Sequence, residues 1–163
     1  MAILDSGERT QFYDKDGNEM AVRDMREGKG RCDLMPLDVV ANVGDCWDDW
    51  QRDTFVLIHE FQTTGNLSFL WKVLRWFGSH VFSDPQTMLL ETAKHFEDGA
   101  KKYGEHNWQK GIPVSCYIDS AIRHYLKWLR GDSDEPHDRA FCWNIMCAIW
   151  TCKHIPELNN KEK

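Results

Sequence analysis

Apolar side chains recur every three or four positions along most of the chain after residue 45, which is the spacing of one face of an α-helix. The pattern is most regular after Asp84-Pro85, where an aspartate suited to cap a helix precedes a proline suited to the first helical turn. The apolar stripe that follows consists of Leu89, Ala93, Phe96, Ala100 and Tyr103. We therefore predict a helix from residue 85 to the loop that Gly104 opens.

Two further helices are predicted in the C-terminal part of the chain. One runs from about Ser115 to Arg130 and ends at Gly131, a residue type common just after a helix. The other begins near Pro136 and runs through Cys152. Upstream, the spacing predicts two helices between residues 45 and 83, broken at residues 63–66, and a short helix over residues 36–42.

The N-terminal segment, residues 1–33, is polar and rich in glycine. Asp16-Gly17-Asn18 stands between Phe12-Tyr13 and Met20-Ala21-Val22, a pattern typical of a tight turn between two strands. We expect a short β-hairpin or an ordered arm.

A chain of 163 residues fits one domain, and a hydrophobic fraction of 42% with eight tryptophans excludes a disordered protein. The predicted fold is mainly α-helical, with all of residues 1–163 in a single domain. It divides into an N-terminal arm or hairpin (1–36), a helical insertion (45–84) and core helices that carry the site (85–153).

Charge and composition narrow the function. A net charge of -6 argues against binding long nucleic acid, which depends on Lys and Arg neutralising phosphates. No basic leader and no run of about 20 apolar residues is present, so we expect neither secretion nor membrane insertion. Six cysteines without a C-x-x-C pair fit thiols buried in a cytoplasmic protein.

The predicted helix after residue 85 carries a dense set of polar residues. Glu91, His95, Asp98 and Lys102 share one flank, and Glu97 and Lys101 follow a neighbouring line. This set either holds a ligand or is a solvated face with ion pairs between residues four apart.

On the next predicted helix, Asp119 and Arg123 are four residues apart and His124 adjoins them. Arg and His in the middle of a helix can hold phosphate oxygens, the Arg through its bidentate fork. An ordinary Asp-Arg ion pair explains the first two residues equally well.

The segment from Asp132 to Asp138 places four carboxylates and His137 across a loop and a helix start. Asp134 and Asp138 could bind Mg²⁺ together with substrate phosphates, or the segment could simply cap the helix. Asn144, two turns after His137, would be a polar group among apolar neighbours and would need a partner, either a base or a hydrogen-bond network.

The loop over residues 101–111 mixes cations, an amide and aromatic rings. Such a mixture suits stacking on a base and gripping phosphates, although Trp108 could instead cover the core. Its candidate residues are Lys101, Lys102, Tyr103, Asn107, Trp108 and Lys110.

Four stretches of the sequence together resemble a phage-encoded family, the dATP/dGTP diphosphohydrolase N-terminal domain. They are FEDGAKKYG (96–104) with NW (107–108), KGIP (110–113), DSAIRH (119–124) and GKGRCDLMP (28–36). The resemblance covers roughly residues 22–36 and 90–150, with the stretch between these blocks as the insertion. It implies a relation to MazG-like all-α pyrophosphatases, which use Mg²⁺ held by helix carboxylates, and, by analogy with them, a homo-oligomer.

The resemblance and the residue types together suggest roles for individual residues. Glu97, Asp119 and His124 are the catalytic candidates, and Glu91, Glu97, Asp134 and Asp138 are the candidate Mg²⁺ ligands. The candidate nucleotide contacts are Lys101, Lys102, Tyr103, Asn107, Trp108, Lys110, Arg123, His137 and Asn144. The chain departs from the MazG-like pattern of E-x-x-E on one helix and E-x-x-D on the next, because only residues 135–138 fit either motif.

Three functions follow from these residues. The first is Mg²⁺-dependent hydrolysis of a purine deoxynucleoside triphosphate to its monophosphate and pyrophosphate. The second is a non-catalytic sponge that sequesters a cyclic or ADP-ribose-derived signal of antiphage defence, in the cytoplasm of an infected host. The third is a helical partner-binding protein, with the aromatic stretch from Trp47 to Phe82 as a dimer interface.

Overall fold

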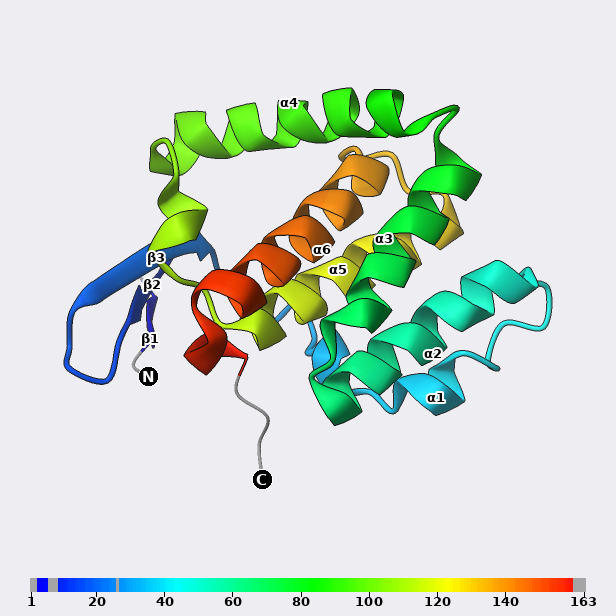
Figure 1. Ribbon diagram of the computed structural model, residues 1–163, viewed down its shortest axis with the longest axis horizontal. Coiled ribbons are helices and arrows are strands. Elements are labelled where there is room, and N and C mark those ends of the chain that lie inside the picture. The colour runs from blue at the N-terminus through cyan, green and yellow to red at the C-terminus, as the bar shows by residue number, and fades with distance from the viewer. Residues whose placement is uncertain (1–2, 6–8, 26, 160–163) are drawn as a thin grey trace.

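The computed structural model describes residues 3–5, 9–25 and 27–159. Among them, six α-helices follow a small antiparallel sheet (Figure 1). The strands are β1 (Ile3–Asp5), β2 (Arg9–Tyr13) and β3 (Glu19–Asp24). The helices are α1 (Leu37–Val40), α2 (Asp49–Thr64), α3 (Leu67–Val81), α4 (Pro85–Tyr103), α5 (Val114–Arg130) and α6 (His137–His154), with short 3-10 turns η1 (Cys32–Leu34), η2 (Asn107–Lys110) and η3 (Pro156–Leu158).

Local signals set the ends of the long helices. The carboxylate of Asp84 accepts a hydrogen bond of 2.6 Å from the backbone N–H of Thr87, and Pro85 follows in the first turn of α4. Helices α2 and α5 stop at Gly65 and Gly131, whose φ angles of 72° and 84° lie in the left-handed region that glycine adopts without strain. These helices therefore begin and end close to where the sequence pattern predicts.

The core lies where α5 and α6 pack along each other and α3 crosses them (Figure 1). Aromatic rings fill this junction: the Phe77 centroid is 4.6 Å from that of Phe141 and 6.0 Å from that of Tyr125. Phe55 of α2 meets Tyr125 edge-on at 5.1 Å. All four rings are fully buried, so the helices of the expected insertion share one core with α5 and α6.

The N-terminal sheet has the order β1-β2-β3 with antiparallel pairing throughout. The turn between β2 and β3 is closed by Asp14, whose Oδ1 accepts hydrogen bonds from the backbone N–H groups of Asp16 and Asn18. Gly17 takes a φ of 84° in this turn. The predicted hairpin is confirmed, and β1 adds a third strand to it.

Helix α4 lies along α6, and its C-terminal end leads into η2 beside the sheet (Figure 1). Strand β3 docks on η2, where the backbone N–H of Ala21 donates to the carbonyl of Gly111 over 3.1 Å. A strand from the start of the chain and a helix end from its middle are thereby held together.

The mainly α-helical fold predicted from the sequence is confirmed. All six cysteines are free thiols; four are buried as expected, whereas Cys32 is half-buried and Cys46 is exposed. Within the described part of the chain, no helix has the length and apolar character needed to cross a membrane.

Candidate functional site

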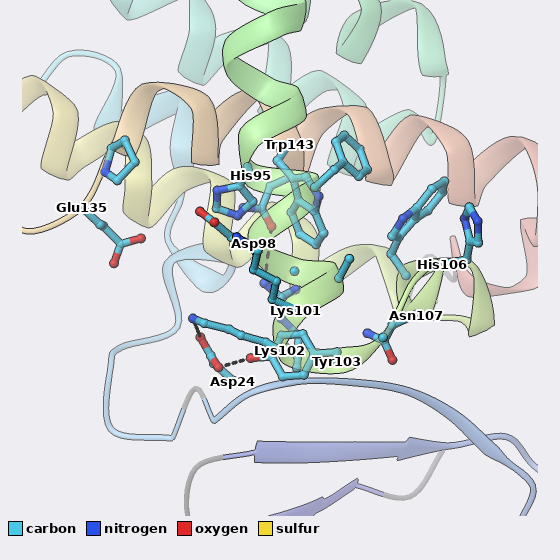
Figure 2. Close-up of a pocket in the computed structure, with 18 of the residues that line it drawn as sticks. Asp24, His95, Asp98, Lys101, Lys102, Tyr103, His106, Asn107, Glu135 and Trp143 are labelled. Atoms are coloured by element: carbon cyan, nitrogen blue, oxygen red, sulfur yellow. Dashed lines mark hydrogen bonds and ion pairs between the residues drawn. The ribbon is translucent and has the colours of Figure 1, made fainter.

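A cavity of about 460 Å³ opens between β3, the C-terminal half of α4, the η2 loop and the facing ends of α5 and α6 (Figure 2). This volume lies within the range of about 300–1,000 Å³ that is common for small-molecule sites. The charged, histidine and amide side chains in its lining are Arg23, Asp24, His95, Asp98, Lys101, Lys102, His106, Asn107, His124, Glu135 and Asn144.

Arg23 of β3 is a half-buried cation in the cavity lining. Its Nη2 donates to the hydroxyl of Ser120 over 3.0 Å and to Oδ1 of Asn144 over 3.4 Å, and its Cζ lies 5.5 Å from the centroid of the Tyr117 ring. Its Nη1 is buried and meets no hydrogen-bond acceptor among the described residues. Among the described residues Arg23 also forms no ion pair, so its positive charge has no carboxylate partner.

Asn107 fixes the position of Arg23 through the strand backbone. Its Oδ1 accepts from the N–H of Val22 over 3.0 Å, and its Nδ2 donates to the carbonyl of Val22 over 2.7 Å. Both ends of the amide are used, and the side chain is 7% exposed. Asn107 therefore acts as a one-residue extension of the sheet next to Arg23.

The mouth of the cavity is held by contacts between β3 and the end of α4 (Figure 2). The Tyr103 hydroxyl donates to Asp24, and Lys102 Nζ lies 3.9 Å from the same carboxylate. From β2, Arg9 stacks over the Tyr103 ring at 5.1 Å and donates to the carbonyl of Lys102 over 2.7 Å. Burial of the side chain, together with the hydrogen bond to Asp24, raises the pKa of Tyr103, so the hydroxyl stays protonated.

Two histidines in the cavity wall are kept neutral by their surroundings. Burial lowers the pKa of His95 to about 4, with the nearby Arg139 acting in the same direction. Burial also lowers the pKa of His124 to about 3, and the neighbouring His137 adds to this effect. The ring centroid of His95 lies 5.2 Å from that of Trp143, whose indole Nε1 is buried and has no acceptor among the described residues.

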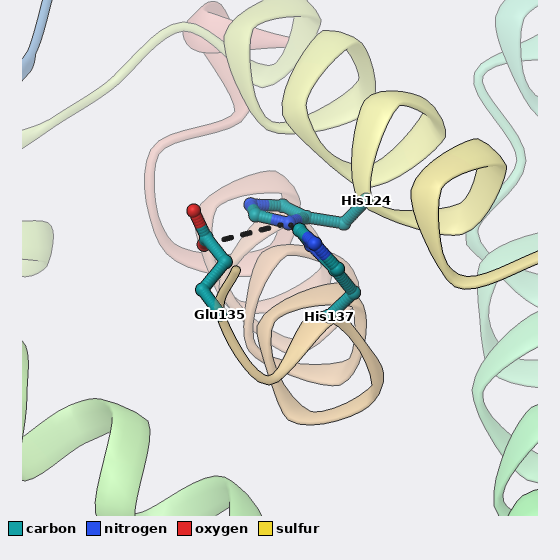
Figure 3. Close-up of side chains that lie close together, drawn as sticks. All are labelled: His124, Glu135 and His137. Carbon is teal, nitrogen blue, oxygen red and sulfur yellow. Dashed lines mark hydrogen bonds and ion pairs between the residues drawn. The ribbon is translucent and has the colours of Figure 1, made fainter. Parts of the chain in front are cut away.

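At the edge of the cavity, His124 meets the start of α6 (Figure 3). The Nδ1 atoms of His124 and His137 are 2.9 Å apart, and Oε1 of Glu135 lies 3.7 Å from Nδ1 of His124. On its other side, Nε2 of His137 lies 2.7 Å from Oδ1 of Asp134. His137 is thus buried between an imidazole and a carboxylate, using both ring nitrogens.

Asp119, one of the expected catalytic residues, is completely buried away from the cavity lining. Its Oδ1 accepts from the backbone N–H of Cys32 over 2.7 Å, and its Oδ2 pairs with Nη2 of Arg123 over 2.8 Å. The same Arg123 nitrogen donates to the carbonyl of Gly30 over 2.5 Å. This Asp-Arg pair holds the segment before η1 against α5.

The carboxylates expected to bind metal do not converge. Glu91 pairs with Lys94 at 2.8 Å and with Arg139 at 3.7 Å, while Glu97 pairs with Lys101 at 3.1 Å on an exposed face of α4. Neither of these glutamates lines the cavity, and neither do Asp134 and Asp138. An Mg²⁺ site built from these four carboxylates therefore does not fit the arrangement of the described residues.

The cavity lining contains about half of the residues to which the sequence assigned individual roles, together with His95 and Asp98 of the polar set on α4. Those inside are Lys101, Lys102, Tyr103, Asn107, Trp108, His124 and Asn144, and those outside are Glu91, Glu97, Lys110, Asp119, Arg123, Asp134, His137 and Asp138. Sequence reasoning missed Arg23 and Trp143. Arg23 lies near the end of a short strand with no spacing that links it to α5 or α6, so nothing local marks it.

The model of the family described as dATP/dGTP diphosphohydrolase, N-terminal, matches residues 74–161, more than half of the chain. The chain belongs to this family. No curated protein matches the chain, and no solved structure does. The match to the diphosphohydrolase family begins inside α3 and includes every element of the cavity except β3, which supplies Arg23 and Asp24.

Proposed function

We propose that the cavity binds a purine deoxynucleoside triphosphate and that the protein hydrolyses it to the monophosphate and pyrophosphate. The observation that carries the proposal is Arg23, a half-buried guanidinium in the cavity lining that has no carboxylate partner among the described residues. A cation of this kind is stabilised by an anion with several oxygens, and a phosphate chain is such an anion. Membership of the diphosphohydrolase family supports the same class of substrate.

The cavity lining combines positive charge with aromatic surface, and a nucleotide needs both. Lys101 and Lys102 add flexible positive charges at the rim, next to the inner charge of Arg23. Trp143 and the neighbouring Phe96 supply aromatic surface for a base, and the indole N–H of Trp143 has no acceptor among the described residues. We therefore place the phosphates near Arg23 and the base near Trp143.

Hydrolysis needs a group that takes a proton from the attacking water. The water oxygen would bond to the α-phosphorus, the bond from that phosphorus to the bridging oxygen would break, and pyrophosphate would leave. Asp98 is the carboxylate of α4 that lines the cavity, and we assign it the role of accepting the water proton. Its Oδ2 lies 3.4 Å from Nη2 of Arg139, which orients the group.

A divalent cation would enter with the triphosphate, since Mg²⁺ is often bound by substrate phosphates and only one or two carboxylates. It would neutralise charge on the leaving pyrophosphate. The four carboxylates expected to hold Mg²⁺ do not form one group among the described residues, so the cation would be bound mainly by the substrate phosphates.

The test compares turnover by the wild-type protein, Arg23→Gln and Lys72→Gln with dATP, dGTP and pyrimidine triphosphates, each with Mg²⁺. Mass spectrometry would follow the monophosphate and pyrophosphate. Losing a charge-assisted hydrogen bond of about 1.5–3 kcal/mol should lower kcat/KM of Arg23→Gln about 10- to 100-fold. Lys72→Gln is the control, because this exposed lysine of α3 lies outside the cavity lining and is not a candidate nucleotide contact.

Equal turnover by wild type and Arg23→Gln would contradict the assignment of the phosphate site. Recovery of an intact nucleotide from the wild-type protein, with no monophosphate formed, would contradict hydrolysis and leave sequestration as the activity.

A further inference from the structure

The edge of the cavity brings together three side chains with metal-binding atoms. His124 comes from α5, His137 from the first turn of α6, and Glu135 from the loop between them (Figure 3). One ligand atom from each side chain can be chosen so that all three lie within 4.8 Å of one another. None of the carboxylates predicted as Mg²⁺ ligands belongs to this group.

The separations match those around a small cation. Bonds from zinc of about 2.0–2.1 Å to nitrogen and 2.0–2.2 Å to oxygen, at tetrahedral angles, place neighbouring ligand atoms about 3.3–3.5 Å apart. The two Nδ1 atoms are 2.9 Å apart, and Nδ1 of His124 lies 3.7 Å from Oε1 of Glu135. Both distances differ from the expected ones by a few tenths of an ångström, which small side-chain rotations can supply.

The far side of His137 has the partner that a metal-binding histidine usually has. Its Nε2 lies 2.7 Å from Oδ1 of Asp134, and Lys127 approaches the other oxygen of that carboxylate at 3.4 Å. A proton on Nε2, donated to Asp134, leaves the lone pair of His137 on Nδ1 and directed toward His124. A carboxylate behind the histidine also fixes the ring and increases its basicity as a ligand.

Rigid helices hold the two histidines, and a metal ion bound by the three side chains would have coordination positions open to the cavity. His137 is buried in α6, and α5 and α6 pack along each other, so the two imidazoles are held by rigid elements. His124 and Glu135 both line the cavity. The remaining coordination positions of a cation held here would therefore face the cavity contents.

We propose that His124, Glu135 and His137 form a site for a divalent transition-metal ion of the zinc class, with Asp134 as a positioning residue. Two imidazoles favour such ions over Mg²⁺, which prefers oxygen ligands throughout. The site does not depend on the nucleotide assignment, since its three ligands come from this chain alone.

The test is direct metal binding without nucleotide. Protein treated with a chelator and then dialysed would be titrated with Zn²⁺ by calorimetry and with Co²⁺ by visible absorption. We expect one equivalent to bind, with the intense Co²⁺ bands of a four- or five-coordinate site, and no comparable binding of Mg²⁺. Thermal unfolding, with and without Zn²⁺, would show that each variant is folded.

Three variants locate the ion. His124→Gln should abolish saturable binding, and Asp134→Asn should weaken it by about 10- to 100-fold, the usual cost of losing the group behind a ligating histidine. His106→Asn is the control, because His106 lines the same cavity outside the metal-binding group and asparagine tolerates its φ of 60°.

The absence of one-equivalent binding by the wild-type protein would overturn the proposal, as would a folded His124→Gln protein with unchanged affinity. Loss of binding in His106→Asn alone would place the ion elsewhere in the cavity and also overturn it. None of these readouts depends on turnover, so failure of this site and failure of the hydrolase assignment are distinguishable.

Discussion

The polar residues of α4 and those of the α5–α6 pair differ in what they contact. Glu97 and Lys101 of α4 pair with each other in solvent, with side chains 65% and 71% exposed. Asp119 of α5 is fully buried and Asn144 of α6 is 1% exposed, and both contact segments from the start of the chain. The dense charges on α4 are therefore mostly a solvated face, whereas the sparse polar groups of α5 and α6 hold the N-terminal segments in place.

This difference determines how much each polar contact contributes to the stability of the protein. A buried polar group loses its hydration and must be satisfied, so its partners are specific. An exposed pair can break with little cost. The contrast between α4 and the α5–α6 pair predicts effects of very different size.

The largest effect should come from Asp119→Ala. The change leaves Arg123 without its carboxylate and the N–H of Cys32 without its acceptor, so the free energy of unfolding should fall by about 3–5 kcal/mol. Urea denaturation measures this. Asp49→Ala is the control, because Asp49 is 98% exposed and 3.9 Å from Arg52. If Asp119→Ala lowered the free energy of unfolding as little as Asp49→Ala does, buried and exposed ion pairs would not differ in the way proposed.

Acid should destabilise the protein through His95. Its pKa falls from 6.5 to about 4 on folding, so the unfolded chain binds the proton more readily between these values. The stabilisation is complete above pH 6.5 and is lost as the pH drops toward 4, at up to about 1.4 kcal/mol per pH unit.

The measurement is the unfolding free energy at pH 6.5, 5.8 and 5.0 in the presence of a chelator. His95→Gln should reduce the slope by up to about 1.4 kcal/mol per pH unit and leave the share of His124, whose pKa is also lowered. His154→Gln, which changes an exposed histidine stacked on Trp150, is the control and should not reduce the slope. An unchanged slope in His95→Gln would show that the imidazole is hydrated in the folded protein.

Asn107→Ala should lower the free energy of unfolding by less than Asp119→Ala does. It removes both hydrogen bonds to the backbone of Val22 and should cost about 1–3 kcal/mol. Faster hydrogen exchange at the amide of Val22 would show that β3 has loosened from η2. Asn42→Ala, which removes one exposed bond of 3.3 Å to the carbonyl of Asp38, is the matched control; equal effects of the two changes would contradict the docking role of Asn107.

The helices could be predicted because their signals are local. Asp84-Pro85 marks the start of α4 and Gly131 the end of α5 within a few residues of sequence. The mainly helical fold and the β2–β3 hairpin follow from such signals and are confirmed.

Fewer residues of the candidate site could be predicted from the sequence, because the site depends on contacts between distant segments. Asn107 meets Val22 across 85 residues, and Arg23 meets Asn144 across 121. Spacing on one helix also cannot say which flank faces a strand. The family resemblance pointed to Glu97 rather than its neighbour Asp98, although of the two only Asp98 lines the cavity. The meeting of His124 with His137 likewise follows from how α5 packs on α6, which helical spacing alone does not give.

The smallest expected effect is that of Glu97→Gln. The pair with Lys101 is exposed, so the unfolding free energy should change by less than about 0.5 kcal/mol, and turnover of a purine triphosphate should stay at the wild-type level. Asp98→Asn is the matched variant one position along the same helix, and it should lower kcat at least about tenfold because it removes the proposed proton acceptor. If Glu97→Gln loses activity while Asp98→Asn keeps it, the catalytic carboxylate is the exposed Glu97. The charges on that face of α4 would then have a catalytic role, and the proposed difference between α4 and the α5–α6 pair would be wrong.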